Sequence, residues 1–241
     1  MSEHQSFLSS LKIRRGEVIS LVGAGGKTSL MYRLAEEGRA IDWRVLVTTS
    51  TRILTPRPEQ YDLLDLSGGI LADKDSLPPG IYVAGVPDSD PAKMRGVAME
   101  LLYYHLNRFD LVLIEADGSA GKPLKGWQAT EPVVPHFTSS TVGVLDIQTI
   151  GRTIDDSLVH RPGLFSLLTG GSEGDMVSLG HLLRVITQSE GLFKDSVGAE
   201  KLFINKVESR ADQQQTDLLK TQIENVQVTA GSVQQGTIYG S

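Results

Sequence analysis

The sequence predicts an α/β fold, a three-layer sandwich with a mainly parallel sheet. Apolar, strand-like runs alternate with helix-like segments over the 241 residues, as is typical of parallel sheets covered by helices. A glycine-rich turn ending in Lys-Thr joins the first run to the first helix-like segment, and the apolar run 111–114 leads directly into Glu115. Because no linker or repeat interrupts this alternation, we expect one domain over residues 1–241.

The composition argues against several classes of protein. The formal net charge is -6, which disfavours a broad surface for nucleic acid or for anionic membrane. There is no cysteine, so disulfides, thiolate metal sites and cysteine nucleophiles are excluded. No apolar run approaches the roughly 20 residues that cross a bilayer, and the amino-terminal stretch lacks a signal-peptide core. We therefore expect a cytoplasmic protein.

The segment 16–35, GEVISLVGAGGKTSLMYRLA, carries the strongest functional signal. Its apolar run predicts a buried strand, and apolar residues recur at helical spacing after Thr28. Lys27 and Thr28 therefore fall in the first turn of a helix, where free N–H groups and the helix dipole favour an anion. Leu21 stands where the full P-loop pattern has its first glycine, so the loop has the shortened form G-x-x-G-K-T, which resembles that of the Mur ligases. The predicted phosphate-binding residues are Gly23, Ala24, Gly25, Gly26, Lys27, Thr28 and Ser29. They predict that residues 1–241 form a single P-loop NTPase-like, nucleotide-binding domain.

The remaining elements follow in chain order. Residues 44–49 (RVLVTT) predict a second buried strand, which runs into the hydroxyl residues 48–51. Weaker strands are expected at 62–66 and 81–86, separated by glycine- and proline-rich turns. Pro91 is expected to open a helix over 92–109, because proline suits the first helical turn and the apolar residues fall on one face. The later elements expected are strands at 111–114, 141–146, 201–205 and 226–229, a loop with a short helix at 151–174, and helices at 179–188 and 211–224.

Binding a nucleoside triphosphate requires a divalent ion and a carboxylate besides the anion cradle. Glu115 directly follows four apolar residues, so we interpret Glu115 and Thr28 as the residues that hold Mg²⁺, with Lys27 on the outer phosphates. Asp117 is placed to orient water or a substrate hydroxyl, because ligands gather at the carboxyl ends of parallel strands. A helix cap and a solvated turn acid are the alternative roles for the two acids.

Thr49 and the residues after the 201–205 strand are further candidates. Thr49 could contact the γ-phosphate, although threonine also favours strands for reasons unrelated to ligands. Asn205 and Lys206, together with Glu208, resemble the guanine-reading N-K-x-D motif of GTPases. Glutamate in place of aspartate adds one methylene and changes the reach, so both ATP and GTP stay open as the nucleotide.

His160 and two lysines could handle a second ligand. His160 stands beside Arg161 and could serve as an acid, a base or a phosphate contact. Lys122 and Lys125 flank Pro123 just after the two acids and could hold phosphate or an acidic substrate. The structural alternatives are a loop histidine without catalytic function and two exposed lysines.

Five segments carry a resemblance to a known family: LVGAGGKTS, VTTSTR, LIEADGSAGKPLK, VHRPGLF and LFINKVE. In order and spacing they resemble the YqeC family of selenium-dependent hydroxylase accessory proteins, from about Phe7 to Gln234. The resemblance implies a role in supplying or maturing the cofactor of selenium-dependent molybdenum hydroxylases, but it does not supply the reaction. The positions carried over are the loop 23–28, the hydroxyl residues 48–51, Glu115, Asp117, Lys122, Lys125, His160 and Arg161.

Three functions follow from these observations. The first is a Mg²⁺-dependent NTPase or phosphotransferase that uses ATP or GTP in hydroxylase maturation. The second is a nucleotide-gated chaperone, whose residues 48–51 switch between ordered and loose states and control docking on a molybdenum hydroxylase. The third is a non-catalytic protein for a phosphorylated metabolite, which needs only the glycine loop. The sequence leaves all three open, together with the acceptor, which could be a cofactor precursor.

Overall fold

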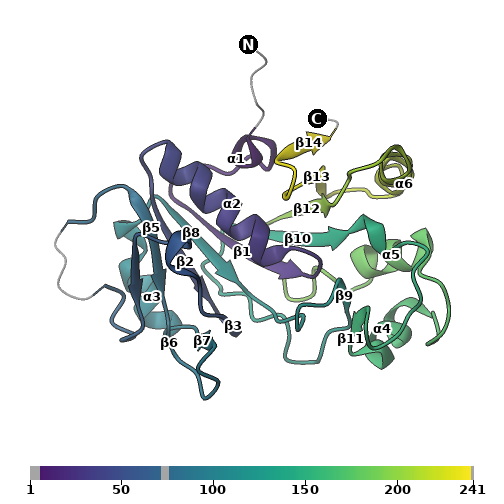
Figure 1. Ribbon diagram of the computed structural model, residues 1–241, viewed down its shortest axis with the longest axis horizontal. Helices are drawn as coiled ribbons and strands as arrows, with labels where there is room; N and C mark the ends of the chain where they lie inside the picture. The colour runs from purple at the N-terminus through teal and green to yellow at the C-terminus, as the bar shows by residue number, and fades with distance from the viewer. Residues whose placement is uncertain (1–5, 72–75, 240–241) are drawn as a thin grey trace, which may run out of the picture.

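The computed structural model describes residues 6–71 and 76–239 and has three layers, with a nine-stranded sheet in the middle (Figure 1). Neighbouring strands are parallel, except for the antiparallel pair at one edge. In order across the sheet the strands are β14 (Thr237–Tyr239), β13 (Gln227–Ser232), β12 (Ala199–Asn205), β10 (Ser140–Asp146), β1 (Glu17–Gly23), β8 (Leu111–Glu115), β2 (Arg44–Thr49), β5 (Gly80–Ala84) and β4 (Leu63–Asp65). The predicted α/β class and mainly parallel sheet are confirmed.

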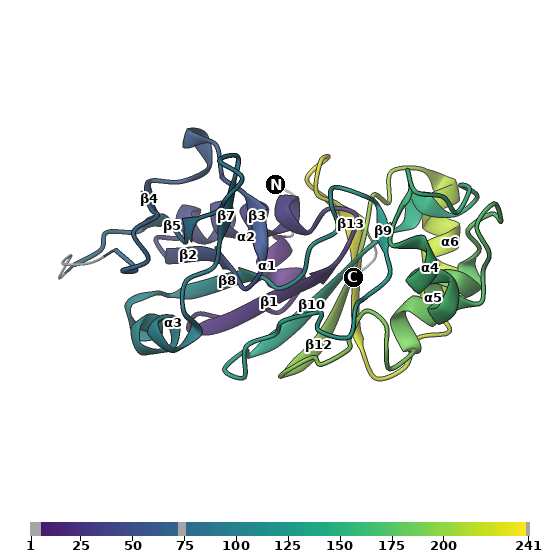
Figure 2. The same ribbon diagram turned by 90° about the horizontal axis from the view of Figure 1, so that it is seen from below.

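Helices cover both faces of the sheet because successive side chains of a strand point to opposite faces. From β1, Ile19 and Leu21 join a core cluster with α1 (Phe7–Ser10) and α2 (Lys27–Ala40), whereas Val18 and Val22 face the other side. Figure 2 shows α4 to α6 gathered beside the half of the sheet that contains β10 and β12, with α3 at the other end. The helices of this second face are α3 (Met99–His105), α4 (Pro162–Thr169), α5 (Leu179–Thr187) and α6 (Arg210–Lys220).

Local sequence explains where several helices begin. Ser178 and Ser209 are the N-caps of α5 and α6, and the side chain three residues further on completes a capping box in each case. In contrast, α2 has Gly26 as its N-cap and no side-chain cap, which leaves its first-turn N–H groups for another partner. Across the two described ranges, no helix has the length and apolarity needed to cross a bilayer.

Smaller elements connect the strands of the central sheet. They are a three-stranded antiparallel sheet of β3 (Arg52–Leu54), β7 (Lys93–Arg95) and β6 (Val86–Pro87), a parallel pair of β9 (Leu124–Lys125) and β11 (Val159–His160), and the 3₁₀ turns η1 (Pro58–Gln60), η2 (Leu106–Arg108) and η3 (Ile147–Thr149). The β9–β11 pair places two segments distant in sequence beside the carboxyl end of β1 (Figure 1).

The helix predicted over 92–109 is wrong in its first half. Residues 93–95 form β7, and the α-helix begins only at Met99. Met94 is completely buried in β7, and a Cβ on Gly96 would lie 1.8 Å from the carbonyl oxygen of Thr49. Strand pairing and this close approach to β2 therefore outweigh the helical spacing of the apolar residues, as tertiary contacts often outweigh local propensity.

Two strand predictions also need correction. The run 81–86 is not one strand, because it divides at Gly85 into β5 of the central sheet and β6 of the small sheet. The strand predicted at 226–229 is not the last, because β14 follows and pairs antiparallel with β13. The predicted strands at 44–49, 111–114, 141–146 and 201–205 and the helix at 179–188 are confirmed within a few residues.

Candidate functional site

The glycine loop between β1 and α2 is shaped by close contacts that only glycine permits. Gly23, Gly25 and Gly26 have φ angles of +98°, +80° and +127°, in the region that disfavours other residues. A Cβ on Gly25 would lie 2.4 Å from the Cβ of Asp146, and one on Gly26 would lie 2.3 Å from Nδ2 of Asn205. The glycines of the predicted loop therefore lie where the backbone turns. The ends of neighbouring strands pack closely against this loop.

Thr28 and Glu115 lie together as predicted for a metal pair. The Thr28 hydroxyl donates a 2.6 Å hydrogen bond to Oε2 of Glu115, and the ammonium of Lys27 lies 3.9 Å from Oε1. Burial raises the pKa of Glu115 above its ordinary value; Lys27 and the Thr28 hydroxyl counteract this effect, whereas Asp117 adds to it. Burial thus disfavours the ionised carboxylate despite Lys27, and a further cation beside it would stabilise that form.

The donor set fits Mg²⁺. Within the described residues there is no cluster of three or more His, Cys, Asp or Glu side chains able to hold a metal ion. An ion held by Thr28 and Glu115 would therefore take its other oxygen ligands from phosphate and water, which is the usual arrangement for Mg²⁺ in nucleotide sites. Such an ion would neutralise charge on the phosphates that it contacts.

Asp117 is completely buried and holds the start of the glycine loop. Its two oxygens accept 3.1 Å hydrogen bonds from the N–H of Gly23, and Lys27 lies 3.2 Å away. Lys125 and the indole N–H of Trp127 each donate to Oδ2 at 2.9 Å. The carboxylate is thus surrounded by protein donors, an arrangement that suits a positioning residue for the loop.

From Asp117 an alternating chain of charges leads away from the loop. Lys125, whose side chain is fully buried, also donates to Glu131 at 3.2 Å, and Glu131 accepts two hydrogen bonds from Arg161, at 2.6 and 3.0 Å. Burial alone would raise the pKa of Glu131, but the bonds from Arg161 and Lys125 hold it below its ordinary value. Lys27, Asp117, Lys125, Glu131 and Arg161 form what we call the ionic chain. Because each buried charge has an opposite neighbour, the chain lowers the cost of burying its members.

Two residues of this arrangement, Glu131 and Trp127, were not predicted from the sequence. Both lie in the irregular segment after β9, where no periodicity or motif marks them. The ammonium of Lys125 also lies over the Trp127 ring, 5.4 Å from the ring centroid, in a cation–π contact. Only the contacts with Asp117 and Lys125 reveal that the two residues belong to the site.

Asn205, predicted as part of a base-binding motif, lies against the glycine loop. Its Nδ2 donates to the carbonyl oxygen of Gly25 at 2.9 Å, and its Oδ1 accepts from the N–H of Val233 at 3.2 Å. Lys206 donates to Oδ2 of Asp146 at 2.5 Å, and burial raises the pKa of that aspartate despite the lysine. The end of β12 therefore joins the glycine loop to the turn after β13.

Two other predicted residues stand apart from the loop. The Thr49 hydroxyl is buried and donates to the carbonyl oxygen of Glu115 at 2.7 Å, so it links β2 to β8. His160 lies on β11 in register with Lys125. Among the contacts of the described residues, its imidazole touches neither Lys27 nor Glu115, and Lys125 lies between His160 and Asp117.

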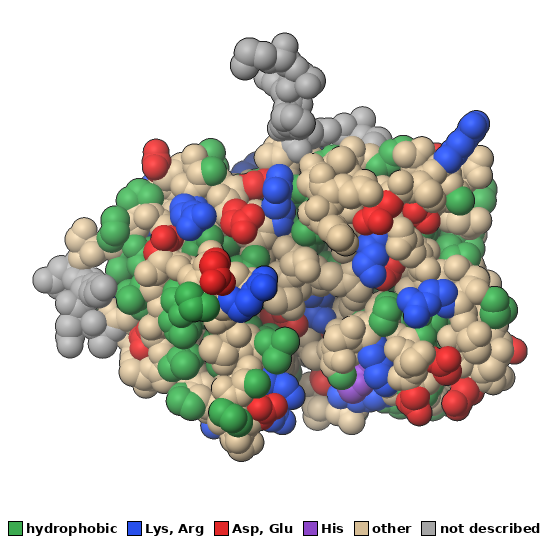
Figure 3. Space-filling model, in the orientation of Figure 1, with side chains coloured by type: hydrophobic (Ala, Val, Ile, Leu, Met, Phe, Trp, Pro, Cys, Tyr) green, Lys and Arg blue, Asp and Glu red, His purple; other side chains and the backbone are tan. Residues whose placement is uncertain are grey.

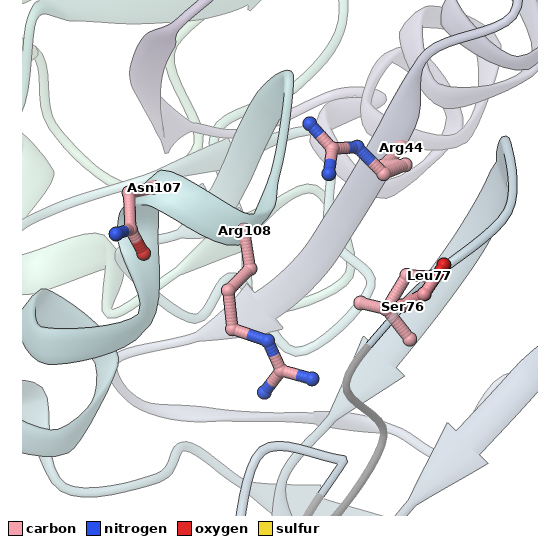
Figure 4. A pocket seen from close by; sticks show the side chains of 5 residues that line it. All are labelled: Arg44, Ser76, Leu77, Asn107 and Arg108. Atoms are coloured by element: carbon pink, nitrogen blue, oxygen red, sulfur yellow. The ribbon is translucent and has the colours of Figure 1, made fainter.

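Figure 3 shows a hollow with basic and acidic side chains, located where Figure 1 shows the carboxyl end of β1 beside β9. A different hollow, of about 280 Å³, lies at the amino ends of β2 and β8 (Figure 4). Its arginines already have partners, because Arg44 binds Asp110 and Arg108 donates to the carbonyl oxygen of Ile70. The glycine-loop edge is therefore the candidate functional site.

Comparisons with known proteins identify the family of this chain. The family model for YqeC protein matches residues 19–163, which include the glycine loop, Glu115, Asp117 and His160 but end before Asn205. The uncharacterized protein YqeC of Escherichia coli strain K12 is 32% identical over 184 residues, which cover 76% of this chain and 72% of that protein. No solved structure matches the chain. The family model and this relative confirm the resemblance seen in the sequence, and the chain belongs to the YqeC family.

Proposed function

We propose that this protein binds ATP or GTP with Mg²⁺ and hydrolyses the nucleotide or transfers its terminal phosphoryl group. The observation that carries the proposal is the meeting of three groups at one sheet edge. They are a glycine loop that leads into an uncapped helix N-terminus, the buried Lys27, and the hydrogen-bonded pair of Thr28 and Glu115. Triphosphate binding needs an anion cradle, a cation for the outer phosphates and oxygen ligands for a metal ion.

Each residue has a defined task under this proposal. The N–H groups of the glycine loop and of the first turn of α2 donate to phosphate oxygens, and Lys27 leaves the Gly23 carbonyl and Asp117 to reach the β- and γ-phosphates. Thr28 and Glu115 hold the ion and its waters. Asp117 keeps Gly23 in place during this exchange.

The base is proposed to bind near the end of β12. Asn205 supports the loop through Gly25, and Lys206 at the same strand end offers an aliphatic stem on which a base can lie. Glu208 accepts hydrogen bonds from Ser232 at 2.7 Å and Gln148 at 3.3 Å, so a base that used this carboxylate would have to replace them. The wider role, in maturing selenium-dependent molybdenum hydroxylases, is supported by the family resemblance.

A thermal-shift series tests the proposal. ATP or GTP with Mg²⁺, at about one hundred times its dissociation constant, should raise the melting temperature by about 5–10 °C, because a ligand that binds only the folded state stabilises it by about 2.7 kcal/mol. Stabilisation without any need for Mg²⁺ would favour the metabolite-binding alternative. Hydrolysis that appears only with a hydroxylase present, and yields no modified small molecule, would favour the nucleotide-gated chaperone. No stabilisation by any nucleotide would refute nucleotide binding.

The metal assignment predicts a specific phenotype for Glu115→Gln. Glutamine keeps an oxygen for the Thr28 hydroxyl but lacks the negative charge, so we expect the Mg²⁺ concentration needed for half-maximal stabilisation by nucleotide to rise by at least about tenfold. A Mg²⁺ titration at fixed nucleotide measures this change. Glu190→Gln, at a surface-exposed glutamate, is the matched control. An unchanged Mg²⁺ requirement in Glu115→Gln would remove Glu115 from the metal site.

A further inference from the structure

The segment that follows the two acids lies directly against the glycine loop. The carbonyl oxygen of Pro123 would be 3.1 Å from a Cβ on Gly25, and the next two residues form β9, which pairs in parallel with β11. Lys122 precedes β9 and His160 ends β11, and the Lys122 ammonium lies 3.3 Å from the carbonyl oxygen of Val159, the residue before His160. Figure 3 shows Lys and Arg side chains next to a histidine on this face, in the region of β9, β11 and α4.

The imidazole of His160 is half-buried and, within the described parts of the chain, makes no hydrogen bond, ion pair or ring contact. The charged groups that act on it are Arg161 of its own segment, Lys125 and Lys122 from the β9 segment, and Glu131. Burial lowers the pKa of His160, the three cations lower it further, and Glu131 opposes them. The imidazole, which has no polar partner among the described residues, thus lies where burial and nearby cations disfavour its protonated form.

Lys122 differs from the other two cations in its counter-ion. Lys125 and Arg161 are held by Glu131 within the ionic chain. Lys122 donates to the carbonyl oxygen of Val159 at 3.3 Å, and its nearest carboxylate, Asp156, is 3.9 Å away with its side chain 83% exposed. A solvent-exposed ion pair at that distance contributes little. Lys122 can therefore turn to an incoming anion without losing a strong interaction.

We propose that Lys122 and His160 form a subsite for an anionic group, a phosphate or a carboxylate, of a second small-molecule substrate bound beside the glycine loop. The inference rests on the proposed function, because it makes this subsite the acceptor side of the nucleotide site. An anion would supply the imidazole with the hydrogen-bond partner that the protein does not provide. It would also give the ammonium of Lys122 a closer counter-ion than Asp156, which lies 3.9 Å away.

The subsite can be tested by following the His160 imidazole by NMR in the full chain, with its signal assigned from His160→Asn. Inorganic phosphate and acetate serve as separate probes, and the titrations are repeated in Lys27→Ala to keep phosphate from the glycine loop. We expect one or both probes to raise the pKa of His160 by about 1, because a negative charge within hydrogen-bond reach favours the protonated ring. The stronger probe then identifies the anionic group.

Lys122→Gln should reduce the affinity of the probe at least about tenfold, which corresponds to loss of one charge-assisted hydrogen bond. Lys93→Gln, at a surface-exposed lysine paired with Asp90, should leave the affinity unchanged. Three results would each overturn the subsite: no response of His160 to either probe, a response that persists in Lys122→Gln, or a response that disappears in Lys27→Ala. A separate result would refute the nucleotide proposal alone, namely no stabilisation by any nucleotide while phosphate still acts on His160 through Lys122.

Discussion

Lys27→Ala is expected to weaken the binding of ATP and GTP by about 100-fold, because each charge-assisted hydrogen bond to phosphate that is lost costs about 1.5–3 kcal/mol. The side chain of Lys27 is 3% exposed. Its ammonium contacts the carbonyl oxygen of Gly23 and the carboxylate of Asp117. Both contacts lie within the proposed cradle, so a phosphate can replace them after a small movement of the side chain. Isothermal titration calorimetry with each nucleotide and Mg²⁺ measures the loss.

The loss of affinity is separable from a loss of folding. In Lys27→Ala, Asp117 keeps its bonds to Gly23, Lys125 and Trp127, so we expect a folded protein with an unchanged circular dichroism spectrum. Lys93→Ala removes a lysine from the exposed end of β7 and is the matched control. Equal affinity of folded Lys27→Ala and wild-type protein for both nucleotides would contradict the proposed function.

Asp117→Ala is expected to lower the free energy of unfolding by about 3–5 kcal/mol, because it leaves buried cations without their carboxylate. Lys27 is 3% exposed and the Lys125 side chain is completely buried, and both lie within 3.2 Å of Asp117. The Gly23 N–H and the Trp127 indole would lose their acceptor as well. Denaturant unfolding followed by circular dichroism gives the change in stability.

Two variants make this prediction specific. Asp156→Ala removes an aspartate that is 83% exposed near Lys122, and it should leave the unfolding midpoint unchanged. Asp117→Asn keeps an acceptor for Gly23 but not the charge, so its stability should fall between those of wild type and Asp117→Ala. If Asp117→Ala unfolds at the same denaturant concentration as wild type, Asp117 is not the residue that holds the loop.

The chain order of elements was largely predictable because it depends on local patterns. An apolar run of strand length, glycines and then helical spacing gave β1, the loop and α2 nearly at their observed bounds. The placement of Glu115 near Thr28 was predictable as well, because the carboxyl ends of parallel strands meet at one edge of a sheet. The helix predicted over 92–109 failed where burial of Met94 in a strand pair overrides helical spacing.

The sequence by itself determined the α/β class, the glycine loop and the pairing of Thr28 with Glu115, because each follows from a local pattern or from the geometry of a parallel sheet. Only the tertiary structure decided the neighbours of Asp117. Lys125 and Trp127 lie in the segment that folds back after β8, and Glu131 and Arg161 lie further along the chain. These residues come together through the packing of irregular segments, whose sequences show no periodicity. The same packing places the ammonium of Lys122 at the carbonyl oxygen of Val159, next to His160 in the chain. These contacts depend on where segments fold, and therefore on the whole chain rather than on any stretch of it.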